Sequence, residues 1–145
     1  MRLCHLVYSS RRASQSADDL KDIFETAHSN NAKRGVTGAL FVQEKHFFQV
    51  LEGPQDELLS LFARLMDDPR HTCVTMTLFE ELNYRMFDQW AMAEFNDDNP
   101  DIAKIFDTYS MDFAAQSIPS GVAMWQMLND MARAVLKPTY ATDWA

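Results

Sequence analysis

The sequence is 145 residues long and 47% hydrophobic, which fits one globular domain and excludes a disordered chain. Its formal net charge of −8 argues against nucleic acid or an anionic membrane as a partner, because phosphate groups require a basic surface. No apolar run approaches the length of a membrane span, and the N-terminus lacks the plan of a signal peptide. We therefore expect a cytoplasmic protein. The two cysteines, Cys4 and Cys73, fall in strand-like segments and are expected to be buried, reduced thiols rather than metal ligands.

The first elements predicted along the chain are a strand over residues 3–8 and, after a polar loop, a helix capped by Ser16. Side chains alternate across a strand, so Tyr8 shares a face with Cys4 and Leu6. The helix carries an apolar stripe at helical spacing, formed by Leu20, Ile23, Phe24 and Ala27.

Two asparagines stand where this stripe leaves the core, three and four residues after Ala27. One interpretation is C-terminal capping of the helix by Asn30 and Asn31, with Gly35 as the actual stop. The other is that both amides face a polar ligand at the edge of the core.

A hairpin follows, with strands over residues 36–43 and 46–54 joined by a tight turn. Gly38 is expected to allow a close backbone approach. Gln49 shares a face with Phe47 and Leu51, which should be buried. A buried amide needs partners for its donors and acceptors, so Gln49 either meets water at an edge or faces a polar ligand.

The rest of the first 96 residues predicts a second helix, a fourth strand over 72–81 and a fifth strand over 90–95. Pro54 fits the first helical position, and Asp67-Asp68-Pro69 ends the helix. Arg70 and His71 then precede the fourth strand. The second helix has one apolar stripe, formed by Leu58, Leu61, Phe62 and Leu65.

This order predicts an α+β fold, a ferredoxin-like two-layer βαββαββ domain over residues 1–96. Val7, Phe48 and Val50 make the second sheet face apolar as well, so it needs cover. Residues 97–145 contain two weaker helical patterns, which we expect to pack on that face as part of the same compact unit. Trp125, Met127 and Met131 are candidate contact points for a partner.

Strand parity allows four side chains to share the face covered by the first two helices. They are Tyr8, Gln49, Trp90 and Met92. Pockets with apolar walls and a few convergent polar groups suit a flat heteroaromatic ligand, and amide, Arg and His groups match a pyrimidine-like edge. Each residue taken singly also has an ordinary structural explanation as core packing or a solvated loop.

The chain resembles the BLUF family of blue-light receptors that use flavin. The matching segments, over about residues 1–96, are Tyr8, Asn30-Asn31, residues 35–38, 48–54, 68–71 and 87–92. The resemblance implies a flavin between the two helices, most often FAD, with FMN or riboflavin possible. It implies that Asn30 and Asn31 hydrogen-bond the pyrimidine side of the ring and that Arg70 and His71 lie near it. Ile23, Phe24 and Ala27 are expected to form its walls.

The resemblance also implies a photoreceptor mechanism. Light would drive electron and proton transfer from Tyr8, through Gln49, to the flavin. Rearranged Gln49 hydrogen bonds would then shift the flavin absorption to the red and signal through the fifth strand, with Trp90 and Met92, and the C-terminal helices. Whether Gln49 rotates or tautomerises stays open. Trp90 could donate an electron in a competing path.

These expectations describe a sensor without turnover. We expect output through a separate effector protein or self-association as a homo-oligomer. The alternative is a non-photoactive ferredoxin-like binding or scaffold domain. A small flavin reductase is disfavoured, because no G-x-G-x-x-G fingerprint is present.

Overall fold

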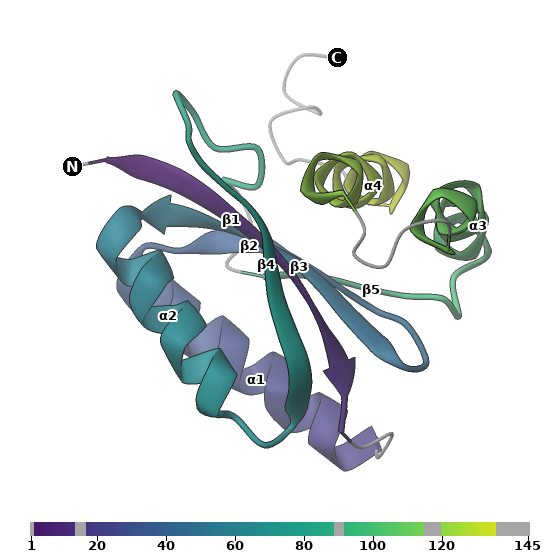
Figure 1. The fold of residues 1–145 in the computed structure, drawn as a ribbon, viewed down its shortest axis with the longest axis horizontal. Helices are drawn as coiled ribbons and strands as arrows, with labels where there is room; N and C mark the ends of the chain where they lie inside the picture. Colours follow the sequence, from purple (N-terminus) through teal and green to yellow (C-terminus); the bar gives the residue numbers. More distant parts are fainter. Residues whose placement is uncertain (1, 14–16, 89–91, 115–119, 136–145) are drawn as a thin grey trace.

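A single mixed sheet, with two helices on each face, forms the domain (Figure 1). The computed structural model describes residues 2–13, 17–88, 92–114 and 120–135, without the side chains of 17–20, 23, 24, 27, 28 and 111–114. The elements in chain order are β1 (Leu3–Arg12), α1 (Ala17–Arg34), β2 (Thr37–Val42), β3 (His46–Pro54), α2 (Gln55–Asp67), β4 (His71–Glu81), β5 (Ala93–Asn96), α3 (Pro100–Ala114) and α4 (Gly121–Val135).

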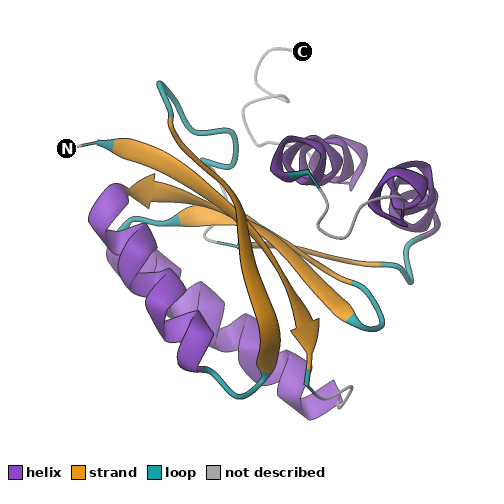
Figure 2. Ribbon diagram, viewed as in Figure 1, coloured by secondary structure: helices purple, strands orange, loops and turns teal. Residues whose placement is uncertain are grey.

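The strand order is β4-β1-β3-β2-β5, and all neighbours are antiparallel except β2 and β5, which are parallel. Helices α1 and α2 cover one face of the sheet, and α3 and α4 lie on the other, as Figure 2 shows. This arrangement confirms the predicted ferredoxin-like α+β domain with two C-terminal helices on the opposite face. The fifth strand adds an edge beside β2, so the chain must cross the sheet between β4 and β5.

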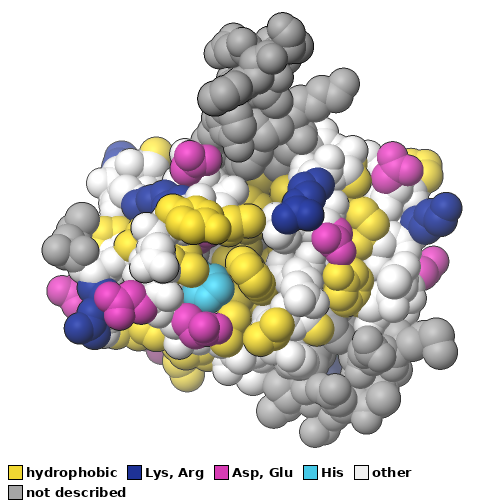
Figure 3. Space-filling model, turned by 90° about the horizontal axis from the view of Figure 1, so that it is seen from above, with side chains coloured by type: hydrophobic (Ala, Val, Ile, Leu, Met, Phe, Trp, Pro, Cys, Tyr) yellow, Lys and Arg dark blue, Asp and Glu magenta, His cyan; other side chains and the backbone are white. Residues whose placement is uncertain are grey.

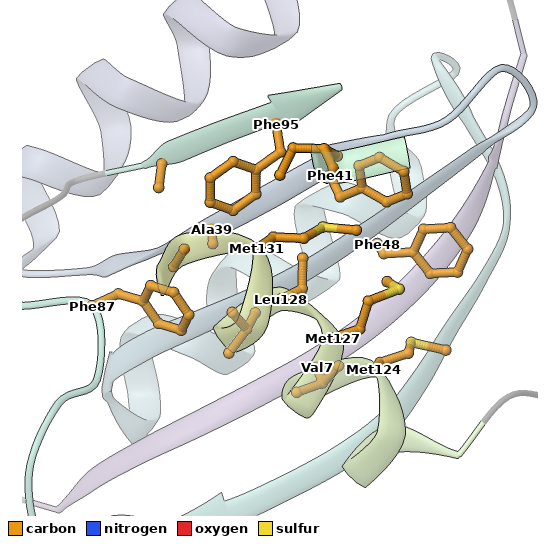
Figure 4. Packing of buried hydrophobic residues seen from close by; sticks show 14 residues of the cluster. Val7, Ala39, Phe41, Phe48, Phe87, Phe95, Met124, Met127, Leu128 and Met131 are labelled. Atoms are coloured by element: carbon orange, nitrogen blue, oxygen red, sulfur yellow. The ribbon is translucent and has the colours of Figure 1, made fainter. Parts of the chain in front are cut away.

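Period-two alternation divides the core into two clusters on opposite faces of the sheet. On the face of α1 and α2, the buried apolar side chains are Cys4, Leu6, Tyr8, Val36, Leu40, Val42, Phe47, Leu51, Leu58 and Met92. On the other face, α4 packs onto alternate strand residues, with Val7, Phe41 and Phe48 beneath Met124, Met127 and Leu128 (Figure 4). Both faces are therefore covered, as the apolar sequence of β1 and β3 requires.

Two glycines permit close backbone contacts. A Cβ on Gly38 would lie 2.1 Å from the carbonyl oxygen of Val50 on β3, which confirms the expected close approach. A Cβ on Gly121, at the start of α4, would lie 2.3 Å from the Thr77 carbonyl oxygen of β4. The first turn of α4 therefore rests directly on the backbone of β4.

Several predicted boundaries were wrong. β1 continues to Arg12, because residues 9–12 pair with β3 and β4 although their side chains are polar. Pro54 is the N-cap of α2 and has extended backbone angles, φ −60° and ψ 137°, so the helix begins one residue later. β5 begins at Ala93, and the expected strand residue Trp90 lies outside the described residues.

The expectation of two buried thiols was half wrong, because Cys4 is buried and Cys73 is exposed. Cys73 has a positive φ of 51°, and the pairing of β1 with β4 shifts between Ser9 and Arg11. Such a bulge on an edge strand breaks the alternation of side chains. Both cysteines are free.

Met127 and Met131 were wrongly expected to contact a partner. Both are fully buried between α4 and the sheet, and Trp125 is half-buried. The surface seen in Figure 3 mixes hydrophobic, acidic and basic side chains. Among the described residues, no helix is long and apolar enough to cross a membrane.

Candidate functional site

A cavity of about 250 Å³ opens between α1, α2 and the sheet. Four leucines, two from the sheet and two from α2, form its apolar lining. The polar lining comes from the sheet and from both helix ends. The lining residues are Tyr8, Thr26, Asn30, Asn31, Leu40, Gln49, Leu51, Leu61, Arg64, Leu65, Asp68, Arg70 and His71.

Tyr8 and Gln49 are direct cross-strand partners in the β1–β3 register. Both side chains are buried, with 1% and 5% exposure, and the Tyr8 hydroxyl donates a hydrogen bond to Gln49 Oε1. Burial raises the pKa of Tyr8 well above its usual value, and the nearby Asp68 charge adds to that effect. Tyr8 is therefore a neutral phenol held against an amide at the cavity wall.

Met92 lies on the other side of the same amide. Gln49 Nε2 donates to Met92 Sδ over 3.3 Å, just before β5 begins. A glutamine amide has two N–H donors and an oxygen with two lone pairs. Its hydrogen bonds to Tyr8 and Met92 use one donor and one lone pair, so Gln49 retains capacity toward a ligand in the cavity.

Asn30 and Asn31 both line the cavity, and Asn31 is buried. The cap of α1 is made by other groups: Gly35 has a φ of 67°, and the Val36 N–H donates to the Asn31 carbonyl oxygen over 3.0 Å. This six-to-one bond around a left-handed glycine is a Schellman cap. The cap uses the backbone carbonyl group of Asn31 and therefore does not require the side-chain amides of Asn30 and Asn31.

The segment after α2 brings three ionisable groups to the cavity rim. Arg70 Nη2 donates to Asp68 Oδ2 over 2.7 Å, and this hydrogen bonding holds the pKa of Asp68 below its usual value. Burial lowers the pKa of His71, so its ring is neutral near pH 7. His71 Nδ1 lies 2.9 Å from the Ser10 hydroxyl of β1, which fixes the orientation of the ring.

Sequence reasoning assigned no role to some lining or supporting residues. Thr26 stands one helical turn before Asn30, so the spacing on α1 could have revealed it. Ser10 lies two residues after Tyr8 on the same face of β1, where the polar sequence predicts a loop. Trp90 and the side chains of Ile23, Phe24 and Ala27 lie outside the described residues. The structure describes no group of three or more His, Cys, Asp or Glu residues that could hold a metal ion.

The fold and the cavity are those of a small ligand-binding domain, with apolar walls and a few convergent polar groups. Residues 3–93 match the family model BLUF, described as sensors of blue light using FAD. The chain belongs to the BLUF family of blue-light photoreceptors, which bind flavin. The donors and acceptors at the rim and the leucine walls fit the polar edge and apolar faces of a flavin ring.

Relatives and solved structures agree with this assignment. Photoactivated adenylate cyclase subunit alpha of Euglena gracilis is 34% identical over 98 residues, or 68% of this chain and 10% of that protein. The dark-state structure of the BLUF protein BlrB has a TM-score of 0.75 at 26% identity and covers 92% of this chain and 98% of that one. The photo-activated state of BlsA has a TM-score of 0.78 at 25% identity, with coverages of 94% and 98%. The chain spans about a tenth of the length of the cyclase relatives it matches.

Proposed function

We propose that residues 1–96 form the photosensory unit, with the ring of FAD in the cavity between α1 and α2. Residues 97–145 would be an extension of the same compact unit. The family description names FAD, whereas FMN and riboflavin carry the same ring. The leucines of the cavity wall suit the two faces of that ring.

In this proposal Asn31 and Asn30 hydrogen-bond the pyrimidine side of the ring, and Arg70 and His71 lie beside it. Support comes from their common position on the cavity lining. A neutral His71 can offer either a donor or an acceptor from the ring nitrogen that does not face Ser10. Ile23, Phe24 and Ala27 are proposed as further walls on the basis of their helical spacing.

A bound flavin absorbs blue light and becomes a strong oxidant when excited. Tyr8 would then give up one electron to that flavin, and its hydroxyl proton would move along the existing hydrogen bond to Gln49 Oε1 while a Gln49 N–H releases a proton toward the flavin. Return of the electron and the proton restores the Tyr8 phenol and leaves no net oxidation. Gln49 ends with rearranged hydrogen bonds, by rotation or tautomerisation. Trp90 is a competing electron donor in this scheme.

The signal leaves the site through Met92. A rearranged Gln49 amide no longer directs the same N–H at Met92 Sδ. Ala93 follows Met92 and pairs with Ala39, and Phe95 packs in the same cluster as the α4 side chains. A shift of β5 therefore reaches α4 through packed side chains.

We propose that the chain is a sensor rather than an enzyme, that it forms homo-oligomers and that it passes its signal to an effector protein. The Euglena relative is named a photoactivated adenylate cyclase subunit, and this chain, whose residues 3–93 match the BLUF model, covers only a tenth of that protein. A sensor part that controls a separate effector part in that relative supports the proposal that this chain signals to an effector protein.

The test is the absorption spectrum of the purified protein in darkness and directly after blue light. The Tyr8–Gln49 hydrogen bond at the cavity wall carries the proposal. We expect a flavin spectrum that shifts to the red and recovers in the dark. A bound flavin without a shift would contradict the mechanism. Failure to bind flavin on reconstitution would leave a binding or scaffold domain.

A further inference from the structure

Glu52 of β3 is a fully buried carboxylate outside the cavity, with 0% exposure. Its two oxygens accept backbone hydrogen bonds from consecutive residues: Oε2 from the Met86 N–H over 2.8 Å and Oε1 from the Phe87 N–H over 2.7 Å. The Thr37 hydroxyl also donates to Oε1 over 3.4 Å. A buried carboxylate is costly unless it is hydrogen-bonded, so these three donors explain how it is tolerated. Glu52 thereby holds a segment that belongs to no helix or strand.

Arg85 holds the same segment from its other end. Its guanidinium donates to Thr37 Oγ1 over 2.9 Å, to the Glu52 carbonyl oxygen over 3.1 Å and to the Gly35 carbonyl oxygen over 2.7 Å. Residues 85–87 are thus fixed to the end of α1, to β2 and to β3. We call residues 85–87 the crossing segment.

The topology explains why the crossing segment matters. β4 and β5 are the two opposite edges of the sheet, so the chain between them must pass β1, β3 and β2. Glu52, on the central strand β3, holds it partway across. Phe87 is buried in the cluster beneath α4, where Figure 4 shows it beside the α4 ribbon. Met92 comes five residues later, and its Sδ accepts the hydrogen bond from Gln49 Nε2.

We propose that Glu52 is a positioning residue of the photosensory site, which holds the crossing segment so that Met92 Sδ meets the Gln49 amide. The proposal deepens the proposed function and rests on it for the light response. Glu52 lies three residues from Gln49 on the same strand, with its side chain on the opposite face. The same crossing segment places Phe87 under α4. Glu52 therefore positions both the Met92 contact with Gln49 and the packing of Phe87 against α4.

The experiment compares Glu52→Gln with Glu44→Gln, a matched change at an exposed turn residue. Glutamine keeps one oxygen acceptor and replaces the other oxygen with an NH₂ group, which cannot accept from a backbone N–H, so one of the two backbone hydrogen bonds is lost. In protein labelled with ¹³C at the methionine methyl groups, we expect the Met92 resonance to move in Glu52→Gln and to stay in Glu44→Gln. We also expect the dark-recovery rate to change at least threefold in Glu52→Gln alone.

A double-mutant cycle separates positioning from general stability. If Glu52 acts through Met92, Glu52→Gln changes the recovery rate less than 1.5-fold in a Met92→Leu background. Equal effects in both backgrounds would overturn the proposal. Should Glu52→Gln fail to fold, Arg85→Ala removes the other anchor of the crossing segment and has the same expected readouts.

The outcomes also separate this proposal from the proposed function. Wild-type protein without a light-induced shift would contradict the function, while a displaced Met92 resonance in Glu52→Gln would still support the positioning role. A normal wild-type shift with an unmoved Met92 resonance in Glu52→Gln would overturn the positioning role alone.

Discussion

Tyr8 and Gln49 face each other across β1 and β3, and the Tyr8 hydroxyl donates a hydrogen bond to the Gln49 amide oxygen. Both strands are buried on both faces, so a register slip of one residue would move every core side chain to the wrong side. The hydrogen bond is therefore set by the sheet itself and not by a loop. Two central strands give a rigid frame to a pair whose hydrogen bonding is proposed to switch.

The first prediction concerns the Tyr8 hydroxyl. Tyr8→Phe keeps the aromatic ring that packs near Phe62 but removes the donor to Gln49. We expect flavin binding to persist and the reversible red shift to disappear, because no phenol remains to give an electron and a proton. The loss of one buried hydrogen bond should cost about 1–3 kcal/mol of folding free energy.

Absorption spectra before and after blue light measure this effect, and urea unfolding measures the cost. Tyr84→Phe is the matched control, because Tyr84 is 71% exposed and the same change there removes a hydroxyl from the protein surface. A red shift of wild-type size in Tyr8→Phe would exclude Tyr8 as the donor.

The second prediction tests the α1 amides. Asn31→Ala removes a buried side chain from the cavity wall without touching the cap of α1, which uses the Asn31 carbonyl group. One lost hydrogen bond of about 1 kcal/mol corresponds to roughly a fivefold weaker flavin Kd. Fluorescence titration of the flavin-free protein measures the Kd. Asn83→Ala, at an exposed position between β4 and β5, should leave it unchanged.

Strand alternation in the sequence allowed Tyr8 and Gln49 to share one face, and the β1–β3 register in the structure places them directly opposite each other. It also indicated the second pair of helices, since Val7 and Val50 required cover on the other face. Gly35 was expected to end the first helix, but the sequence left open whether the Asn30 and Asn31 side chains cap that helix or face a ligand. The structure shows a Schellman cap at Gly35 and both side chains on the cavity lining.

Other features depend on long-range contacts that one sequence does not reveal. Ser10 and Arg12 are polar, and only their pairing with β3 and β4 keeps them in a strand. The bulge that exposes Cys73 shifts the β1–β4 register without a local signal. Met131 looked available to a partner, because helix periodicity does not tell whether an apolar stripe meets the sheet or a second protein.

The third prediction concerns the packing of α4. Leu128 of α4 is fully buried between this helix and the sheet, whereas Leu59 of α2 is 43% exposed. Leu128→Ala should cost about 2–5 kcal/mol of unfolding free energy through lost burial and a new cavity. Leu59→Ala should change it by no more than about 0.5 kcal/mol, as for most surface positions.

Urea unfolding of both variants, at equal flavin concentration, measures the difference. Similar midpoints for Leu128→Ala and Leu59→Ala would show that α4 contributes little to the stability of the sheet. In that case α4 would not be packed on the sheet tightly enough for a shift of β5 to move it.

The last prediction concerns pH and His71. Burial holds the pKa of His71 below its usual 6.5, so the unfolded chain binds this proton before the folded protein does. Folding stability therefore falls as the pH drops from 6.5 through the lowered pKa. His5 and His46 are shifted in the same direction, whereas burial raises the pKa of Glu52, which acts oppositely above pH 4.5.

We expect the Tm of the flavin-bound protein to fall between pH 7 and pH 5.5, and the fall to be smaller in His71→Gln. Subtracting the two curves isolates His71, because His5, His46 and Glu52 are present in both proteins. His46→Gln, at a less buried position, should flatten the curve less. Parallel Tm curves for wild type and His71→Gln would mean that His71 has the same proton affinity in the folded and unfolded chains, and that its ring is not held neutral by the cavity wall.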